Sequence, residues 1–259
     1  MDLHEVTSAS GRRHPWEVTR ARFFRRVLSD AGALAAPRAV LDVGAGDGYV
    51  ARGMLDALPA GSEVVCLDPN YSDEDLRRFA AEPRVGLSFV REAPARRFDL
   101  VTLLDVIEHV PEDRAFLGGF VARSLAPGGL VLVSVPAWQP LFSAHDTALK
   151  HFRRYSPAAC RALLDDVGLV SVCGGGLFHS LLAPRLLEVA GEKVLRLLGR
   201  APTPPSNLGE WHGGALVSGA VERALSVDNA LSHVLARRGL SLPGLSVWAL
   251  CRARDGAAS

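Results

Sequence analysis

Residues 41–50 read LDVGAGDGYV, in which glycines stand at every second position directly after a short apolar run. A glycine loop turns tightly, lets a ligand touch the main chain and points backbone N–H groups at it. The apolar run predicts a buried strand, and residues 49–58 predict a helix. The stretch therefore indicates a strand, a ligand-binding loop and a helix in succession.

The spacing of the glycines discriminates between kinds of ligand. A dinucleotide site normally reads GxGxxG, with the pyrophosphate at the helix N-terminus. Here Gly44, Gly46 and Gly48 give GxGxG, and Asp47 adds a negative charge that would repel a pyrophosphate. Asp68 ends the next apolar run, roughly 20 residues on, where a carboxylate binds both ribose hydroxyls. The pattern favours a nucleoside that carries a cationic centre.

The rest of the chain continues the alternation of strands and helices. Such alternation is typical of a parallel sheet with right-handed crossovers, whose ligands bind at the carboxyl ends of the strands. We predict an α/β, Rossmann-like fold: a seven-stranded, mostly parallel sheet with helices on both faces, an N-terminal helix and a helical insertion between the last two strands. Strands are predicted at 39–44, 63–68, 86–90, 98–106, 128–136, 169–175 and 245–253.

The predicted organisation is one core with two additions. Residues 1–36 are an N-terminal helical cap, 37–174 and 243–259 the core, and 175–242 a helical insertion. The insertion has two amphipathic segments around the linker APTPPSNLG, at 201–209, and is predicted to form a lid or acceptor wall. Three alternatives remain: packing against the sheet, a dimer interface, or membrane-surface contact, since Lys193, Arg196 and Arg200 flank leucines.

Composition excludes several classes of protein. The chain has 259 residues, 48% hydrophobic and 22% charged, with a formal net charge of +1, so no global basic field favours nucleic acid. Its first residues lack the apolar run of a signal peptide, and no stretch reaches the roughly 18 apolar residues of a spanning helix. Four scattered cysteines without a CxxC pair indicate buried thiols. We expect a cytoplasmic monomer or homodimer, with peripheral membrane contact open.

Four motifs in this order resemble the class I S-adenosylmethionine-dependent methyltransferases: VLDVGAGDG, CLDPN, FDLVTLLDVIEHV and LAPGGLVLVSVP. The resemblance covers about residues 40–135 and is nearest to the small-molecule branch that includes ubiquinone-pathway O-methyltransferases. It implies S-adenosylmethionine as the cofactor and S-adenosylhomocysteine as its product.

The resemblance also implies a set of cofactor-binding residues at the strand ends. The glycine loop and the acid before it hold the methionine part, Asp68 binds the ribose, and the two residues after it flank the adenine. Glu92 is the candidate for the adenine amine. Arg20 or Arg22 is the candidate for the methionine carboxylate, unless these arginines belong to a solvated face. The full set is Arg20, Asp42, Gly44, Ala45, Gly46, Gly48, Asp68, Pro69, Asn70, Glu92, Leu104 and Asp105.

SAHDTALKHFRRYSP, at 143–157, follows the fifth strand on the expected acceptor side and is too polar for core packing. Removing the proton of a hydroxyl acceptor accelerates transfer by about 10²–10⁴-fold, a task suited to histidine. His145, oriented by Asp146 or another acid, is the first candidate base, followed by His109 and His151. The candidate substrate-binding residues are Trp138, Arg153, Arg154 and Tyr155. The arginines either clamp an anionic acceptor or pair with acids of the protein.

The predicted activity is methyl transfer from S-adenosylmethionine to a small, partly apolar metabolite at oxygen. Alternatives are a lipid-like or RNA 3′-end acceptor, or a cofactor-binding protein without transfer. Asp105, Glu108, His109 and His145 loosely resemble the metal-binding quartet of RNA 3′-terminal 2′-O-methyltransferases. That family has Glu at the first position, and the balanced charge disfavours RNA. We therefore assign no metal and expect transfer to survive EDTA.

Overall fold

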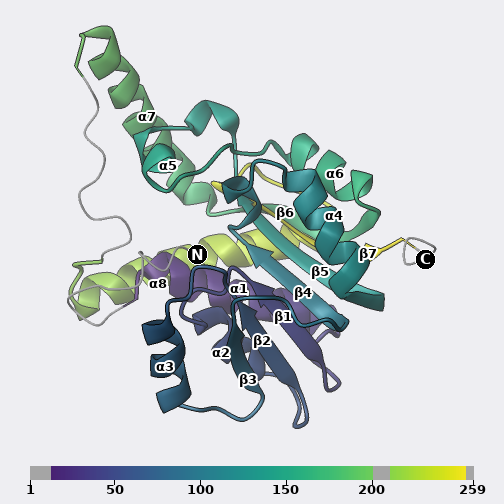
Figure 1. Ribbon diagram of the computed structural model, residues 1–259. Helices are drawn as coiled ribbons and strands as arrows, with labels where there is room; N and C mark the ends of the chain where they lie inside the picture. The colour runs from purple at the N-terminus through teal and green to yellow at the C-terminus, as the bar shows by residue number, and fades with distance from the viewer. Residues whose placement is uncertain (1–12, 201–210, 255–259) are drawn as a thin grey trace.

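The computed structural model describes residues 13–200 and 211–254, whose strands form the seven-stranded sheet at the centre of Figure 1. The strand order is β3-β2-β1-β4-β5-β7-β6, and β7 is antiparallel to both neighbours while β1 to β5 pair in parallel. The predicted fold class is confirmed. The strands are β1 (Ala39–Val43), β2 (Glu63–Leu67), β3 (Leu87–Val90), β4 (Phe98–Leu104), β5 (Leu125–Pro136), β6 (Leu169–Leu177) and β7 (Ser246–Ala253).

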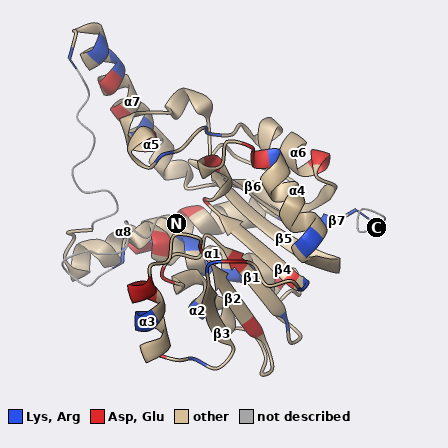
Figure 2. Ribbon diagram, in the orientation of Figure 1, with Lys and Arg blue, Asp and Glu red and all other residues tan. Residues whose placement is uncertain are grey.

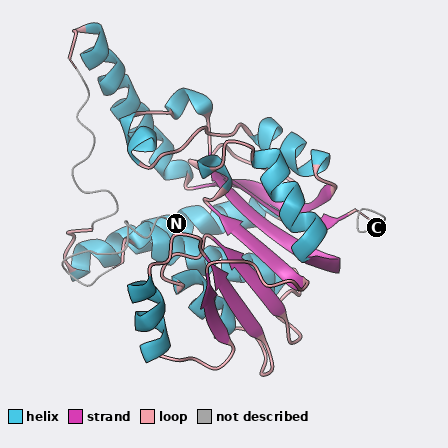
Figure 3. Ribbon diagram, viewed as in Figure 1, coloured by secondary structure: helices cyan, strands magenta, loops and turns pink. Residues whose placement is uncertain are grey.

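Helices cover both faces of the sheet, as Figure 3 shows. One face packs against α1 (Pro15–Asp30), α2 (Tyr49–Leu55) and α8 (Ala215–Ala236), and the other against α4 (Asp113–Ser124) and α6 (Pro157–Asp166). Because side chains alternate along a strand, Val40 joins the first core and Leu41 the second.

Local capping explains where several helices begin. In α3 (Asp73–Ala81), the Ser72 hydroxyl accepts from the Asp75 backbone N–H, and the Asp75 carboxylate accepts from the Ser72 N–H. The same motif, from Ser143 and Asp146, starts α5 (Ala144–Ala148), which sequence periodicity did not predict because it is so short. The 3-10 helices η2 (Ile107–His109), η3 (Gln139–Leu141) and η4 (His179–Leu181) also escaped prediction.

The two helices of the insertion behave differently. α8 lies against α1 and β6, buries Leu225, and bonds His233 Nε2 to the Asp30 carboxylate at 2.8 Å. α7 (Leu182–Leu197) projects from the body in Figure 1, and Leu187 and Leu197 on it are 75% and 86% exposed. These contacts of α8 correspond to the alternative in which part of the insertion packs against the rest of the fold. The predicted linker, at 201–209, lies outside the described residues.

Two further sequence expectations can be compared with the structure. Cys66, Cys160 and Cys251 are buried and Cys173 is partly buried, all as free thiols. Among the described helices, none is long and apolar enough to cross a membrane. Figure 2 shows acidic and basic segments interspersed along the helices, α7 included.

Candidate functional site

A cavity of about 750 Å³ lies at the carboxyl ends of β1, β2 and β4. The strand order changes direction between β1 and β4, the switch point at which such sheets bind ligands. One end of the cavity is polar, with Asp68, Asn70 and Asp105, and the other is rich in apolar side chains. Its lining is Val43, Gly44, Leu67, Asp68, Pro69, Asn70, Ser72, Asp75, Asp105, Val106, His109, Val110, Phe116, Phe120, Leu149, Lys150 and Phe152.

The structure gives two reasons why glycines are required in this loop. Gly44 has a φ of +66°, and a Cβ there would lie 2.6 Å from Val106 Cγ2 at the cavity wall. Gly48 has a φ of +75°, and its Cβ would lie 2.8 Å from the Phe89 ring. Side chains are therefore excluded by backbone conformation and by close approach. Of the three motif glycines, Gly44 is the one in the cavity lining.

Asp68 directly follows β2 and is 4% exposed. Its Oδ1 accepts a hydrogen bond from the Asn70 backbone N–H at 2.9 Å, and its own N–H donates to Val90 O at 3.1 Å. A carboxylate accepts several hydrogen bonds at once. The fixed carboxylate at the cavity wall is thus suited to a ligand that offers hydroxyl groups.

An ion pair between buried Arg20 and the cavity-lining Asp105 lies at the wall of the cavity. Arg20, on α1, is 1% exposed; its guanidinium pairs with Asp105 and lies 4.3 Å above the Trp16 ring. Asp105 has a φ of +55° and also accepts from the Ser134 hydroxyl at 3.2 Å. The N-terminal helix thereby brings a cation to the end of β4.

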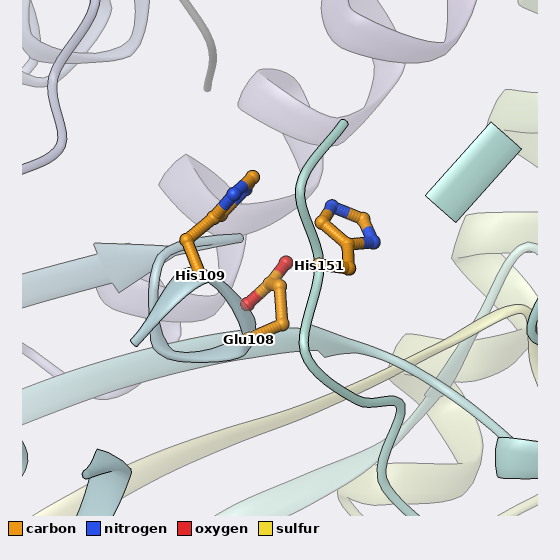
Figure 4. Close-up of side chains that lie close together, drawn as sticks. All are labelled: Glu108, His109 and His151. Carbon is orange, nitrogen blue, oxygen red and sulfur yellow. The ribbon is translucent and has the colours of Figure 1, made fainter. Parts of the chain in front are cut away.

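Glu108, His109 and His151 gather beside the cavity, as Figure 4 shows. Their potential ligand atoms all lie within 4.8 Å of one another, and the two imidazole centroids are 4.6 Å apart. Glu108 is fully buried, which raises the pKa of its carboxyl to about 8. His109 lines the cavity. This cluster, hereafter the Glu108 cluster, combines a buried acid with two histidines at a ligand site.

Asp146 lies behind His151 and is fully buried. Its carboxylate bonds His151 Nδ1 at 2.9 Å, Arg154 Nε at 2.7 Å and Arg185 Nη2 at 2.8 Å, and accepts from the Ser143 N–H at 3.0 Å. Burial alone would raise the pKa of this carboxyl, but the His151 hydrogen bond and the arginine charges outweigh burial and hold it well below its usual range. Asp146 is therefore an ionised anchor for the segment.

The family described as "Methyltransferase domain" matches residues 16–174, more than half of the chain. The chain belongs to this methyltransferase-domain family. The matched range contains the glycine loop, Asp68 and the Glu108 cluster, so the family pattern and the cavity coincide.

Curated relatives carry the same family name. An uncharacterized methyltransferase of Mycobacterium leprae is 31% identical over 159 residues, which cover 54% of this chain and 57% of that protein. An uncharacterized methyltransferase of Mycobacterium tuberculosis is 30% identical over 158 residues, covering 54% and 61%. The chain thus spans little more than half the length of the curated relatives it matches.

Solved structures share the fold at low identity. A Burkholderia thailandensis 1,6-didemethyltoxoflavin-N1-methyltransferase is 17% identical with a TM-score of 0.51, covering 91% of this chain and 78% of that one. An S-adenosylmethionine-dependent methyltransferase from Mesorhizobium loti is 15% identical with a TM-score of 0.50, covering 85% and 92%. At such identities, the likeness extends to the fold alone.

The predicted cofactor residues divide into two groups. Those in the cavity lining are Gly44, Asp68, Pro69, Asn70 and Asp105. Ala45, Gly46, Gly48 and Leu104 are buried outside that lining, and Arg20 lies behind Asp105.

Two predicted acids lie elsewhere. Asp42 accepts from the Thr102 hydroxyl inside the sheet, and burial raises its pKa to about 6. Glu92 is exposed and is not among the lining residues. Neither residue is in the cavity lining: Asp42 is bonded to Thr102, its neighbour on the adjacent β4, and Glu92 lies in a loop beyond β3.

Two of the three predicted catalytic histidines lie together, and the third lies apart from them. His109 lines the cavity and His151 contacts its ring, whereas His145 is half-buried on α5 and outside the lining. Burial, followed by the positive charge of Arg185, lowers the pKa of His145. Asp146, which the sequence paired with His145, bonds His151 instead.

The predicted substrate-binding residues have partners within the protein. Arg153 pairs with Asp113 at 2.8 Å, and the Tyr155 hydroxyl donates to the same carboxylate at 2.7 Å. Arg154 pairs with Asp146, and Trp138 Nε1 donates to Gly244 O at 2.9 Å. None of the four is in the lining of this cavity, and both arginines form ion pairs of the kind that the sequence left open as the alternative to an acceptor clamp. Their role in substrate binding stays a prediction.

The lining contains residues that sequence reasoning missed. Phe116 and Phe120 lie four residues apart on α4, and their rings are 5.0 Å apart, centroid to centroid. Their i,i+4 spacing was a usable signal. Lys150 and Phe152 follow α5 and gave no such signal. No described residue of 175–242 lines the cavity, so a lid there stays a prediction.

Proposed function

We propose that the protein transfers a methyl group from S-adenosylmethionine to an oxygen atom of a small, partly apolar molecule. The observation that carries this proposal is the single cavity that joins Asp68 and Gly44 at one end to His109 and aromatic side chains at the other. Its volume of about 750 Å³ lies within the range of small-molecule sites. Family membership supports the reaction class.

The residues at the polar end fit the cofactor. The Asp68 carboxylate suits the two ribose hydroxyls, Pro69 and Asn70 flank the adenine, and Gly44, which lines the cavity, lies beside the methionine part. When bound, S-adenosylmethionine supplies a methyl carbon activated by a positively charged sulfur. A protein of this fold has been crystallised with S-adenosylhomocysteine and its acceptor, 1,6-didemethyltoxoflavin, which adds support.

The other end of the cavity supports an acceptor with an apolar body. Val110, Phe116, Phe120 and Phe152 provide apolar surface there. His109 offers an imidazole that accepts the proton of a hydroxyl group, which favours oxygen as the methylated atom. We infer that the acceptor is a hydroxylated ring or chain held by these aromatic side chains.

A panel of acceptors tests the proposal against the alternative of a cofactor-binding protein without transfer. Purified protein and S-adenosylmethionine are incubated with hydroxylated aromatic, aliphatic hydroxyl and amine compounds. We expect a mass gain of one methyl group on a hydroxyl compound, with an equal amount of S-adenosylhomocysteine. Methylation of the amines alone would contradict the oxygen assignment. Cofactor binding without any product would favour the alternative.

Asp68→Ala tests the cofactor end of the cavity. Removing a buried acceptor of ligand hydrogen bonds costs about 1–3 kcal/mol, so we expect affinity for S-adenosylmethionine to fall roughly 10–100-fold by calorimetry. Glu74→Gln, an exposed acid on the neighbouring α3, is the matched control and should bind as the wild type does. Unchanged affinity in Asp68→Ala would remove Asp68 from the site.

A further inference from the structure

We propose that Glu108, His109 and His151 form a binding site for one divalent transition-metal ion in the wall of the cavity. The three ligand atoms lie within 4.8 Å of one another and converge in Figure 4. Metal–nitrogen and metal–oxygen bonds of about 2.0–2.2 Å hold ligand atoms at most roughly 4 Å apart. Small side-chain rotations therefore bring the three groups to ligand distance.

The Glu108 carboxylate is the second observation that supports a cation site. The side chain is fully buried, and among the described residues neither of its carboxylate oxygens has a hydrogen-bond partner. Buried polar groups without partners are rare, since desolvation is not repaid. The Phe152 N–H donates to the Glu108 backbone O at 2.8 Å, and this bond holds the preceding residue, His151, beside Glu108.

The Asp146 carboxylate orients His151 as a metal ligand. Its Nδ1 bonds the Asp146 carboxylate at 2.9 Å, so Nε2 is the nitrogen that faces the other two residues in Figure 4. Ligating histidines in metal sites usually donate their second nitrogen to a carboxylate in this way, which fixes the tautomer and the ring. Asp146 itself is held by Arg154 and Arg185.

The donor set and its position define the kind of ion. Two imidazoles with one carboxylate suit Zn²⁺, Mn²⁺ or Fe²⁺ better than Mg²⁺ or Ca²⁺, which prefer oxygen ligands alone. Three protein ligands leave positions open, and His109 lines the cavity, so the open side faces its interior. An ion held there would offer an open position to an oxygen ligand and would lower the pKa of that ligand. Only this last point rests on the proposed function.

The proposed metal site shares only Glu108 and His109 with the quartet considered in the sequence analysis. Asp105 pairs with Arg20, and His145 is outside the cavity lining. Asp105 and His145 therefore drop out, and His151 takes the third position. The inference also departs from the sequence-based assignment of no metal.

Metal binding by the whole protein tests the inference without cofactor or acceptor. The protein is stripped with EDTA, dialysed, and titrated with Zn²⁺ by calorimetry and with Co²⁺ by visible absorption. We expect one equivalent to bind, and Glu108→Gln and His151→Gln to weaken binding more than about 10-fold. His145→Gln, the same change on neighbouring α5, should leave metal affinity unchanged. Circular dichroism verifies that the variants fold.

Two results would overturn the metal site: no stoichiometric binding by the wild type, or wild-type affinity in a folded Glu108→Gln variant. The S-adenosylmethionine titration is run separately with and without EDTA and should be insensitive to the chelator. Metal binding with no cofactor binding would refute the proposed function and leave the metal site standing. Cofactor binding and methyl transfer without metal binding would refute the metal site and leave the proposed function standing.

Discussion

Replacing Asp146 by alanine is expected to lower the free energy of unfolding by about 3–5 kcal/mol, because it leaves buried arginine charges without their carboxylate. Arg154 and Arg185 are 8% and 7% exposed and both bond Asp146. The same change removes the partners of His151 Nδ1 and the Ser143 N–H. Urea denaturation at pH 7 measures the loss. Asp166→Ala, which breaks an exposed pair with Arg114, should cost less than about 1 kcal/mol.

The contribution of Asp146 should also depend on pH in one direction. The folded-state pKa of its carboxyl is depressed below the ordinary 3.8, so its stabilisation is present above about pH 4 and is lost as the pH falls toward the folded-state pKa. The difference between wild type and Asp146→Asn should therefore shrink when denaturation is repeated at pH 3. An equal difference at both pH values would show that the charge of Asp146 is not what stabilises this segment.

Glu108→Met is expected to stabilise the metal-free protein by about 2–4 kcal/mol at pH 8, since apolar replacement of an uncompensated buried carboxylate is favourable. Burial raises the pKa of Glu108 from an ordinary 4.5 to about 8. The unfolded chain thus releases this proton above about pH 4.5 while the folded protein retains it. Wild-type stability should fall, relative to the variant, as the pH rises from 5 to 8.

Urea denaturation in EDTA at pH 5 and pH 8 measures this change for both proteins. Glu74→Met, at an exposed acid on α3, is the control and should show little difference between the two pH values. A Glu108→Met variant less stable than wild type at pH 8 would show that the carboxylate has a stabilising partner. The expected gain in stability on losing Glu108 is characteristic of a residue retained for function.

The sequence by itself determined the fold class and the polar end of the cavity. Strand and helix periodicities are local, and the glycine loop after Val43 marks the carboxyl end of β1, which borders the cavity. Asp68 was predictable for the same reason, because it directly follows β2 and the ends of parallel strands meet at one edge. Ser72, the N-cap residue, predicted where α3 begins.

Only the tertiary structure decided which polar side chains reach the cavity. His145 and His151 stand six residues apart, and the short α5 and the positive φ of Lys150, +60°, turn the second toward Glu108 and leave the first outside the lining. From the sequence, Asp146 could hydrogen-bond to either histidine. In the folded protein it bonds His151. Such choices depend on contacts between segments far apart in the chain, whose geometry no local pattern encodes.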